Sequence, residues 1–412
     1  MALLAPNIMS TTTTFLQLEE LQQKPTTFHH CSSSGNASNT SQRSRQEGKV
    51  PISKPMEMTQ QVLLLKGVRE QYTLVNDHNI PSVVHPGEIL VKVLAIGLNP
   101  IDWKAPAFNF GIPSLPWING RDLAGLVLQV PDKSSRLRVG DIVLVPSTDY
   151  RDIRKAAFQE YAISTDFNAA RIPSSTSITA SASLGVAFVA SALALDFSLL
   201  TKSTGPNLVN VVNQLDKNSI PTDILNECFA SPDRPQRGDW IAIWGGEINN
   251  SIEIKIADNS PASTTTGLIT LQLAKLAGLR VICVADVARH GTKLLQLGAD
   301  LLVDRQNTER AVEIIRGVTD GKLRYAIDIV GKETATLLER TLEKSGQSHL
   351  LGLTGLPKER DPGIRYHTVP IKLFHEAPAV GESLVCWLES LLQDETLSLP
   401  DVVRAEGGVR RY

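Results

Sequence analysis

The sequence predicts an α/β protein made of two unlike parts, on three observations. The chain has 412 residues, which is more than one hydrophobic core usually serves. Its N-terminal part holds short strand-like runs broken by Pro and Gly, a pattern typical of a compact antiparallel domain. From Trp240 to Gly355, strand-like and helix-like stretches alternate at the spacing of βαβ units, which predicts a doubly wound parallel sheet.

The composition excludes several classes of protein. Hydrophobic residues make up 42% and charged residues 20%, as in ordinary globular chains. The net charge is −2 and no basic stripe is interleaved with aromatics, so we expect no nucleic-acid partner. No apolar stretch is long enough to span a membrane, and the first ten residues lack the pattern of a secretory signal. Four widely spaced cysteines favour a reducing, cytoplasmic location.

The first segment of the chain, residues 1–57, is rich in Ser, Thr, Gln and Asn. Such a composition buries too little apolar surface to offset the entropy of ordering, so we expect a disordered extension. A strand-like run, Gln61–Leu65, follows closely. Met58 or Met56 is therefore an expected start of the folded protein.

Residues 58–180 are expected to form the β-rich domain. Its clearest strand-like runs are 87–97, 123–130 and 139–145. The following stretch, Ser181–Leu200, is apolar and rich in Ala, which predicts a buried helix that crosses into the next domain.

Residues 181–370 are expected to form the second domain. Gly278 and Gly298 stand where helices need a left-handed C-terminal residue. Five strands and three helices are expected here: strands at 241–244, 280–285, 301–303, 325–330 and 349–353, and helices at 268–277, 292–297 and 333–343.

A candidate phosphate-binding turn follows the first of these strands. A dinucleotide pyrophosphate binds where the first strand of such a sheet meets the first helix, because glycines allow close approach and the helix N-terminus offers N–H groups. The strand ends in Trp244-Gly245-Gly246, and the helix is expected to begin only after a polar run. That run is Ser263, Thr264, Thr265, Thr266 and Gly267. An ordinary turn is the alternative reading, and the βαβ context favours the functional one.

The end of the second strand carries signals for both nicotinamide cofactors. Asp286 is placed to accept hydrogen bonds from an adenosine ribose, which favours NADH. Arg289 and His290 could instead bind the 2′-phosphate of NADPH. Solvated loop charges are the alternative for all three.

Two motifs of the N-terminal domain carry a family resemblance: Asn99-Pro100-Ile101-Asp102-Trp103-Lys104 and Gly120-Arg121-Asp122-Leu123-Ala124-Gly125. They resemble the medium-chain dehydrogenase/reductase superfamily, in its zinc-free, quinone-oxidoreductase-like branch. The first motif is similar to fungal trans-acting enoyl reductases that work with polyketide synthases. The resemblance continues through the Trp244 and Thr266 segments and runs from about Met58 to about Pro400.

The resemblance implies a GroES-like β-rich catalytic domain, a Rossmann sheet, and NADPH as cofactor, with NADH as the alternative. It also implies that Asp102, Trp103 and Lys104 lie near the nicotinamide, although Lys104 could equally be a solvated surface lysine. Zinc-dependent relatives use a Cys and a His-Glu pair where this chain has Asn99 and Arg121-Asp122, so we expect no zinc. No proton donor is assigned.

The chain departs from the family pattern at three places. Residues 247–262 are inserted at the phosphate-binding turn, where they would separate its glycines from the helix unless they loop out entirely; we hypothesise that they are translated intron sequence. Residues 202–237 read as a surface excursion. Residues 371–412 would complete the catalytic domain, and we expect a truncation there.

Three functions remain open on the sequence. The first is an enoyl reductase acting on a polyketide intermediate carried by an acyl carrier protein. The second is a stand-alone quinone-oxidoreductase-like or tailoring dehydrogenase acting on a small diffusible molecule. The third is an inactive remnant, favoured by the interrupted turn.

Overall fold

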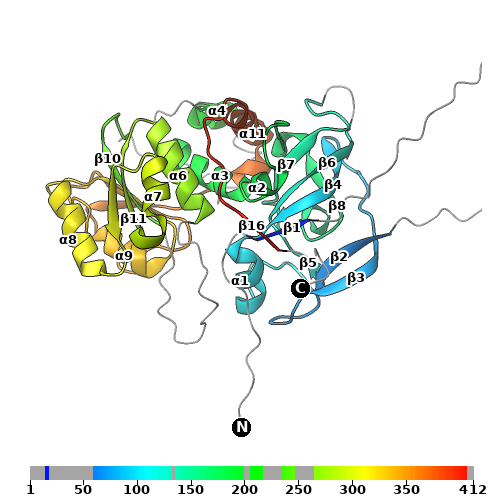
Figure 1. Cartoon of the computed structure of the whole chain (residues 1–412), viewed down its shortest axis with the longest axis horizontal. Helices are drawn as coiled ribbons and strands as arrows, with labels where there is room; N and C mark the ends of the chain where they lie inside the picture. The colour runs from blue at the N-terminus through cyan, green and yellow to red at the C-terminus, as the bar shows by residue number, and fades with distance from the viewer. Residues whose placement is uncertain are drawn as a thin grey trace, which may run out of the picture.

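A computed structural model describes residues 14–17, 59–131, 135–198, 205–216, 234–245 and 264–405. Two domains lie side by side, with a group of helices between them (Figure 1). Gly246, Ser263, the insertion 247–262 and the C-terminal residues 406–412 lie outside the described part. The sequence predictions for those positions therefore stay predictions.

The N-terminal domain is built on antiparallel strands, as the sequence predicts. Its larger sheet has the order β16-β1-β4-β6-β7-β9, with β8 paired to β4, and a smaller sheet has the order β3-β2-β5. The strands of the larger sheet in this domain are β4 (Glu88–Gly97), β6 (Asp122–Gln129), β7 (Ile142–Pro146), β8 (Tyr161–Thr165) and β9 (Ala170–Arg171). Those of the smaller sheet are β2 (Thr59–Leu65), β3 (Thr73–Asn79) and β5 (Trp117–Ile118).

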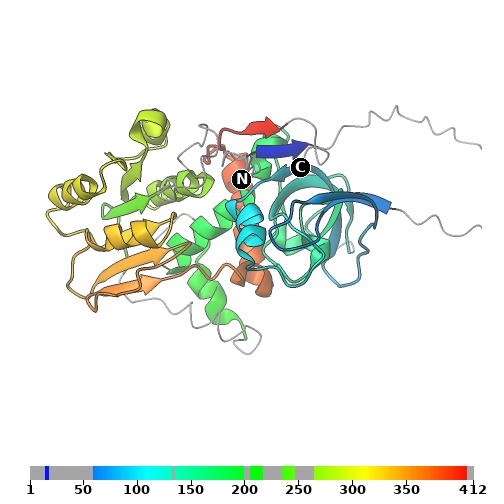
Figure 2. The same ribbon diagram turned by 90° about the horizontal axis from the view of Figure 1, so that it is seen from below.

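Two strands from distant parts of the chain extend the larger sheet. β1 (Thr14–Gln17) pairs antiparallel with β4 and parallel with β16 (Val403–Ala405). The two strands are drawn together near the edge of this domain (Figure 2). The residues of β1 fall within the segment expected to be disordered, and they form a strand instead.

The second domain is a parallel sheet of six strands in the order β12-β11-β10-β13-β14-β15. Five were expected, so the count was one short. The additional strand, β15 (Ile364–His367), is an edge strand with one buried residue, which leaves little apolar signal in the sequence. The others are β10 (Trp240–Trp244), β11 (Arg280–Ala285), β12 (Leu301–Asp304), β13 (Tyr325–Asp328) and β14 (Ser348–Gly352).

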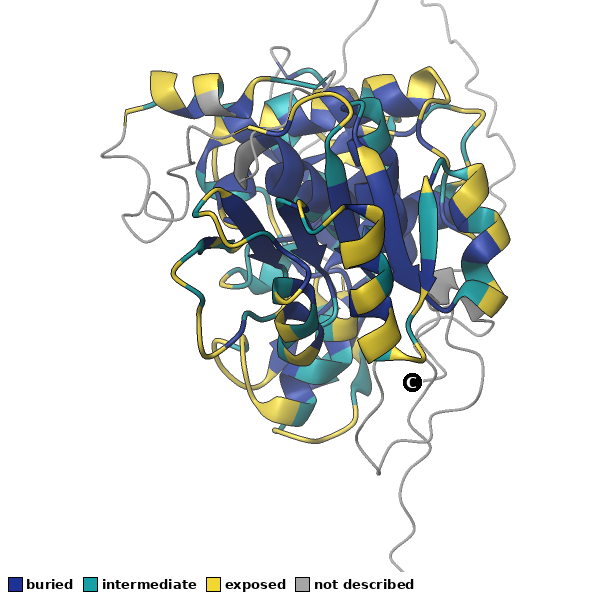
Figure 3. Cartoon of the chain, turned by 90° about the vertical axis from the view of Figure 1, so that its left-hand side faces the viewer, coloured by how far each residue is buried: buried dark blue, intermediate teal, exposed yellow. Residues whose placement is uncertain are grey.

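Helices cover both faces of the parallel sheet. Successive residues of a strand point to opposite faces. Ile241 and Ile243 of β10 accordingly pack in one cluster with α6 (Thr265–Leu276), while Ala242 and Trp244 pack in another with α8 (Thr308–Val318). The strands are buried and the outer helix faces exposed (Figure 3). The further helices are α7 (Val287–Gln296), which begins earlier than expected, α9 (Lys332–Glu339), and α8 itself, which was not expected.

The apolar stretch expected to form one crossing helix is broken into shorter pieces: α2 (Ile178–Ala182), α3 (Gly185–Ala192) and a π-helical turn, η3 (Leu193–Ser198). They lie between the two domains (Figure 1). α11 (Pro378–Gln393) packs against them, and the rings of Phe188 and Trp387 are 5.5 Å apart.

Part of the expected surface excursion belongs to the core. α4 (Leu208–Gln214) contacts α11 and η3, and its Leu208 is fully buried. The hydrophobic spacing of Leu208 and Val212, one helical turn apart, was the signal that the polar flanks obscured. Across the described ranges, none of the helices has the length and apolar character needed to cross a bilayer.

Candidate functional site

The end of the first parallel strand lies directly against the start of the first helix. A Cβ placed on Gly267 would lie 4.0 Å from the Cα of Gly245, and the N–H of Gly245 donates to the carbonyl of Val284 at 3.1 Å. The expected separation from the helix is therefore not found for Gly245, and Gly246 lies outside the described residues. The prediction that residues 247–262 loop out entirely concerns a segment outside the described residues, so it stays a prediction.

The helix begins within the polar run that was expected to precede it. Thr264 is the N-cap of α6, and its Oγ1 accepts a hydrogen bond from the Gly267 N–H at 3.0 Å. Thr265 and Thr266 are the first helical residues, so the expected helix start was too late. The error arises because Ser and Thr are common at caps and weak in helix interiors. An anion at this helix end would meet N–H groups and the positive end of the helix dipole.

The strand order places this turn at the switch point of the sheet. β10 lies between β11 and β13. The chain adds β11 and β12 on one side of β10, and then crosses to add β13 and the later strands on the other side. In sheets of this order, ligands bind at the carboxyl ends of the strands where the direction reverses. Gly245 follows β10 directly, at that position.

A charged cluster lies at the end of the neighbouring strand. Asp286 is the N-cap of α7, and its Oδ1 accepts from the Arg289 N–H at 3.2 Å. Its Oδ2 lies 3.8 Å from Nε of Arg289 and 4.0 Å from a terminal nitrogen of Arg305. Burial lowers the pKa of His290. Arg305 was missed by sequence reasoning, although it directly follows the strand end Asp304 as Asp286 follows Ala285.

The Asn-Pro-x-Asp-Trp-Lys motif forms the start of α1 (Pro100–Phe108). Pro100 occupies the first turn, where its fixed φ suits a helix. Asp102 makes the reciprocal bond of a capping box, because its Oδ2 accepts a hydrogen bond from the backbone N–H of the N-cap residue Asn99 at 2.8 Å. The Lys104 Nζ lies 5.5 Å from the centroid of the Trp103 ring. Asp102 thus has a structural role, and its expected place near a nicotinamide stays a prediction.

The positions of the zinc ligands in zinc-dependent relatives hold a hydrogen-bonded pair. The Asn99 Nδ2 donates to the Asp122 Oδ2 at 2.9 Å, and the Val186 N–H donates to the Asp122 Oδ1 at 2.8 Å. Burial raises the Asp122 pKa to about 7. In the described ranges, no group of three or more His, Cys, Asp and Glu side chains is arranged to hold a metal ion.

Helix α3 connects this pair to the candidate phosphate-binding turn. Val186, in its first turn, binds Asp122, and the Ser191 Oγ donates to the Thr266 carbonyl at 3.2 Å. Five residues of helix rise about 7.5 Å. The two motifs singled out in the sequence, one in each domain, thus contact opposite ends of one short helix.

A buried polar cluster surrounds Arg121 next to this pair. The Arg121 side chain is 2% exposed, and its guanidinium carbon lies 3.8 Å from the centroid of the Tyr150 ring. The Tyr72 hydroxyl donates to the Asp102 carbonyl at 2.6 Å and accepts from the Asn119 Nδ2 at 2.8 Å. Burial raises the pKa of the Asp102 carboxyl to about 7.

Several polar atoms of this cluster have no protein partner within the described ranges, although they are buried: Asp102 Oδ1, Asn119 Oδ1, Arg121 Nε and Ser147 Oγ. Buried polar atoms are otherwise nearly always satisfied by protein, water or ligand. The sequence did not single out Tyr72, Asn119 or Tyr150, since only the fold brings their loops together.

Two family models match the two domains. The alcohol dehydrogenase GroES-like domain matches residues 85–174, and the zinc-binding dehydrogenase model matches residues 265–377. A GroES-like domain joined to a Rossmann sheet of this strand order defines a two-domain oxidoreductase. The chain belongs to the medium-chain dehydrogenase/reductase superfamily, as the sequence motifs predicted.

Two fungal trans-enoyl reductases are distant relatives of this chain. A trans-enoyl reductase of Aspergillus niger, caaB, is 26% identical over 72% of this chain and 71% of its own length. A second trans-enoyl reductase, from Botryotinia fuckeliana, is 30% identical over 63% of this chain and 64% of its own length. Among solved structures, the Escherichia coli quinone oxidoreductase complexed with NADPH has a TM-score of 0.56 at 18% identity, and covers 84% of this chain and 91% of its own. That likeness shows the fold.

Proposed function

We propose that this oxidoreductase is an NADPH-dependent trans-acting enoyl reductase, which reduces an α,β-unsaturated polyketide intermediate in secondary-metabolite biosynthesis. The two relatives named trans-enoyl reductases support this substrate class. The observation that carries the proposal is the contact of Gly245 with Gly267 at the N-terminus of α6. A side chain at either position would occupy the space in which a pyrophosphate approaches such a turn.

The candidate site residues of the two domains suit a dinucleotide that extends from one domain to the other. The pyrophosphate would lie at the turn of Gly245, Gly246 and Ser263 to Gly267, and the adenosine ribose beside Asp286. Arg289, His290 and Arg305 would bind the 2′-phosphate, because they lie at the end of the strand that carries Asp286 and because guanidinium groups bind phosphate through paired hydrogen bonds. This arrangement favours NADPH over NADH.

The nicotinamide end would lie near Asp102, Trp103 and Lys104. When bound, NADPH supplies a hydride for the β-carbon of the substrate. The protein orients the two reactants and stabilises the enolate that forms. We propose that zinc takes no part, because Asn99 and Asp122 bind each other and Arg121 carries a cation where a ligand would be needed.

The proposed substrate is an acyl group bound to the carrier domain of a polyketide synthase, and the proposed location is the cytoplasm. Cys283 and Cys386 are unpaired thiols in the described part of the chain, which suits a reducing compartment. A small diffusible substrate would require the same two domains.

A direct assay tests the proposal. Purified full-length protein is mixed with NADPH and either a 2-enoyl pantetheine thioester, the same acyl group on a carrier protein, or a soluble quinone. We expect loss of NADPH absorbance with both thioesters, and faster loss with the carrier-bound form. Turnover of the quinone alone would support a stand-alone reductase, and no turnover with any of the three would overturn the proposal.

A further inference from the structure

The loop that follows β7 brings a tyrosine to the proposed nicotinamide end of the site. The loop begins beside Asp122, which pairs with Pro146, and the Ser147 N–H donates to the Arg121 carbonyl at 2.6 Å. Pro146 also borders the start of α3, because a Cβ on Gly185 would lie 3.2 Å from its Cα. Tyr150 is the fourth residue of this loop after Pro146. It therefore lies among the elements that connect the two motifs of the site.

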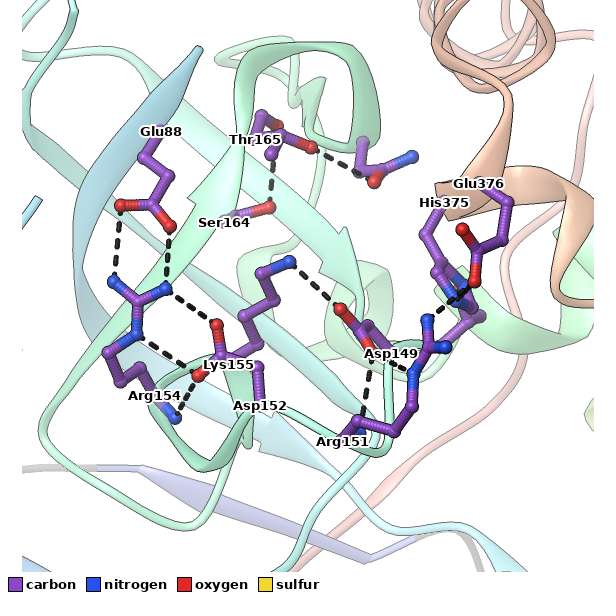
Figure 4. Close-up of polar contacts among 12 residues, drawn as sticks. Glu88, Asp149, Arg151, Asp152, Arg154, Lys155, Ser164, Thr165, His375 and Glu376 are labelled. Atoms are coloured by element: carbon purple, nitrogen blue, oxygen red, sulfur yellow. Dashed lines mark hydrogen bonds and ion pairs between the residues drawn. The ribbon is translucent and has the colours of Figure 1, made fainter. Parts of the chain in front are cut away.

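Ion pairs on both sides of Tyr150 fix the loop (Figure 4). Asp149 binds the Lys155 Nζ at 3.0 Å, and Arg151 binds the Glu376 carboxylate at 2.5 Å. One residue earlier, the Thr148 Oγ1 lies 2.7 Å from the His375 Nδ1. His375 and Glu376 belong to α10 (Leu373–Glu376), so the C-terminal part of the chain holds this loop in place.

Tyr150 stacks on a buried cation. The Arg121 guanidinium lies over the ring face at 3.8 Å, and the Arg121 Nε makes no hydrogen bond within the described ranges. Tyr150 is partly exposed, whereas Arg121 behind it is 2% exposed. The Arg121 cation stabilises negative charge on the ring.

We propose that Tyr150 donates the proton that completes reduction of the substrate, and that Arg121 is its positioning residue. This inference rests on the proposed enoyl reduction. Burial raises the Tyr150 pKa, so the hydroxyl keeps its proton at neutral pH. The second tyrosine of the cluster, Tyr72, has its hydroxyl bound to Asp102 and Asn119, so it is not available for transfer.

The step balances in atoms and charge. Hydride from NADPH forms a C–H bond at the β-carbon, the carbon–carbon double-bond electrons move to the α-carbon and thioester oxygen, and an enolate results. The enolate α-carbon then takes the Tyr150 hydroxyl proton, which breaks the O–H bond and leaves a phenolate beside Arg121. A solvent proton restores the phenol. The products are the saturated thioester and NADP⁺, with one proton consumed.

The test compares Tyr150→Phe with Tyr161→Phe, a tyrosine of β8 outside the cluster. General acid catalysis contributes about 10²- to 10⁴-fold, so we expect Tyr150→Phe to lower kcat by at least about 10²-fold. The NADPH dissociation constant, measured by fluorescence, should stay unchanged in both variants. In D₂O, wild type should place deuterium on one face of the α-carbon, whereas Tyr150→Phe should yield both epimers by NMR.

Arg121 is tested by Arg121→Gln and Arg121→Lys. We expect Arg121→Gln to raise the pKa of Tyr150, which is measured as the tyrosinate absorbance that remains after the signal of the Tyr150→Phe protein is subtracted. We expect Arg121→Lys to have a higher kcat than Arg121→Gln, because lysine keeps the positive charge. Wild-type kcat and one-sided deuteration in Tyr150→Phe would overturn the proposal. If wild type reduces no enoyl thioester at all, the proposed function fails first, and the tyrosinate titration then shows whether Arg121 still governs Tyr150.

Discussion

Gly245 and Gly267 lie so close that a side chain on either would contact the other, although the insertion 247–262 separates them in the sequence. A Cβ on Gly245 would lie 3.9 Å from the Cα of Gly267, and no other described atom approaches it within 4 Å. The strand end and helix N-terminus thus keep the spacing that a phosphate-binding turn needs. Among the described residues, none outside its chain neighbours fills the space beside Gly245 except at Gly267.

Gly245→Ala distinguishes the effect of this position on fold stability from its effect on NADPH binding. The added methyl group makes only an ordinary contact within the protein, so we expect the melting temperature to change by less than about 2 °C. The same methyl would meet the pyrophosphate, so NADPH affinity should fall at least about tenfold, which is about 1.4 kcal/mol. Gly317→Ala on α8, with open space around it, is the control and should bind NADPH as wild type does. Equal affinity in both variants would contradict the assignment.

Cofactor choice should depend on the arginines beside Asp286. Arg289→Gln and Arg305→Gln each remove a cation near the proposed 2′-phosphate site, and hydrogen bonds to charged groups contribute about 1.5–3 kcal/mol. We expect each to weaken NADPH at least about tenfold and to leave NADH unchanged, in parallel titrations. Arg310→Gln, on α8, is the control. Equal loss for both cofactors would mean that these arginines only support the structure.

The buried Asp102 predicts a specific pH dependence of stability. Its pKa is raised to about 7 in the folded protein by burial, so the folded state binds the proton more tightly than the unfolded state. The Asp102 carboxyl contributes fully to the free energy of unfolding below its pKa in the unfolded chain, and this contribution is lost as the pH rises towards about 7. Asp102→Asn removes this loss while keeping an acceptor for the Asn99 N–H.

Urea unfolding of both proteins measures the effect. The stability of Asp102→Asn relative to wild type should increase between about pH 4 and pH 7, by on the order of 1–4 kcal/mol, and then level off. A difference independent of pH would show that Asp102 ionises normally in the folded protein.

Metal analysis tests the zinc-free proposal. Asn99 and Asp122 are bound to each other, and Arg121 adds a positive charge nearby, so the site lacks the anionic and imidazole ligands that zinc prefers. We expect dialysed protein to contain far less than one zinc per chain and to keep its activity in a chelator. Stoichiometric zinc, with activity lost on its removal and regained on its return, would refute this.

The sequence predicted most of what local pattern encodes. Short apolar runs located β10, β11 and β13, and the polar run that includes Thr264 and Gly267 marked the helix start to within a few residues. The edge strand β15 was missed because only one of its residues is buried. α8 was missed although it is amphipathic, since its polar residues dominate the segment.

The candidate site was predicted only where its residues are neighbours in sequence. The Asn99-Pro100 motif and the Asp286 turn are of this kind. Arg305 and Tyr150 were not found, because each joins the site through contacts with residues distant in the chain, namely Asp286 and Arg121. For Arg305, its position directly after the end of β12 was an available signal, whereas for Tyr150 periodicity and motif spacing carry no such information.

The most direct test of the account is a fluorescence titration of NADPH, and in parallel NADH, into the full-length protein. An intact turn at Gly245 and α6, with arginines beside Asp286, predicts saturable NADPH binding with a dissociation constant in the micromolar range, about −8 kcal/mol, and weaker NADH binding. No change in fluorescence up to about 1 mM of either cofactor would contradict it. The chain would then be a reductase by descent that has lost its cofactor site.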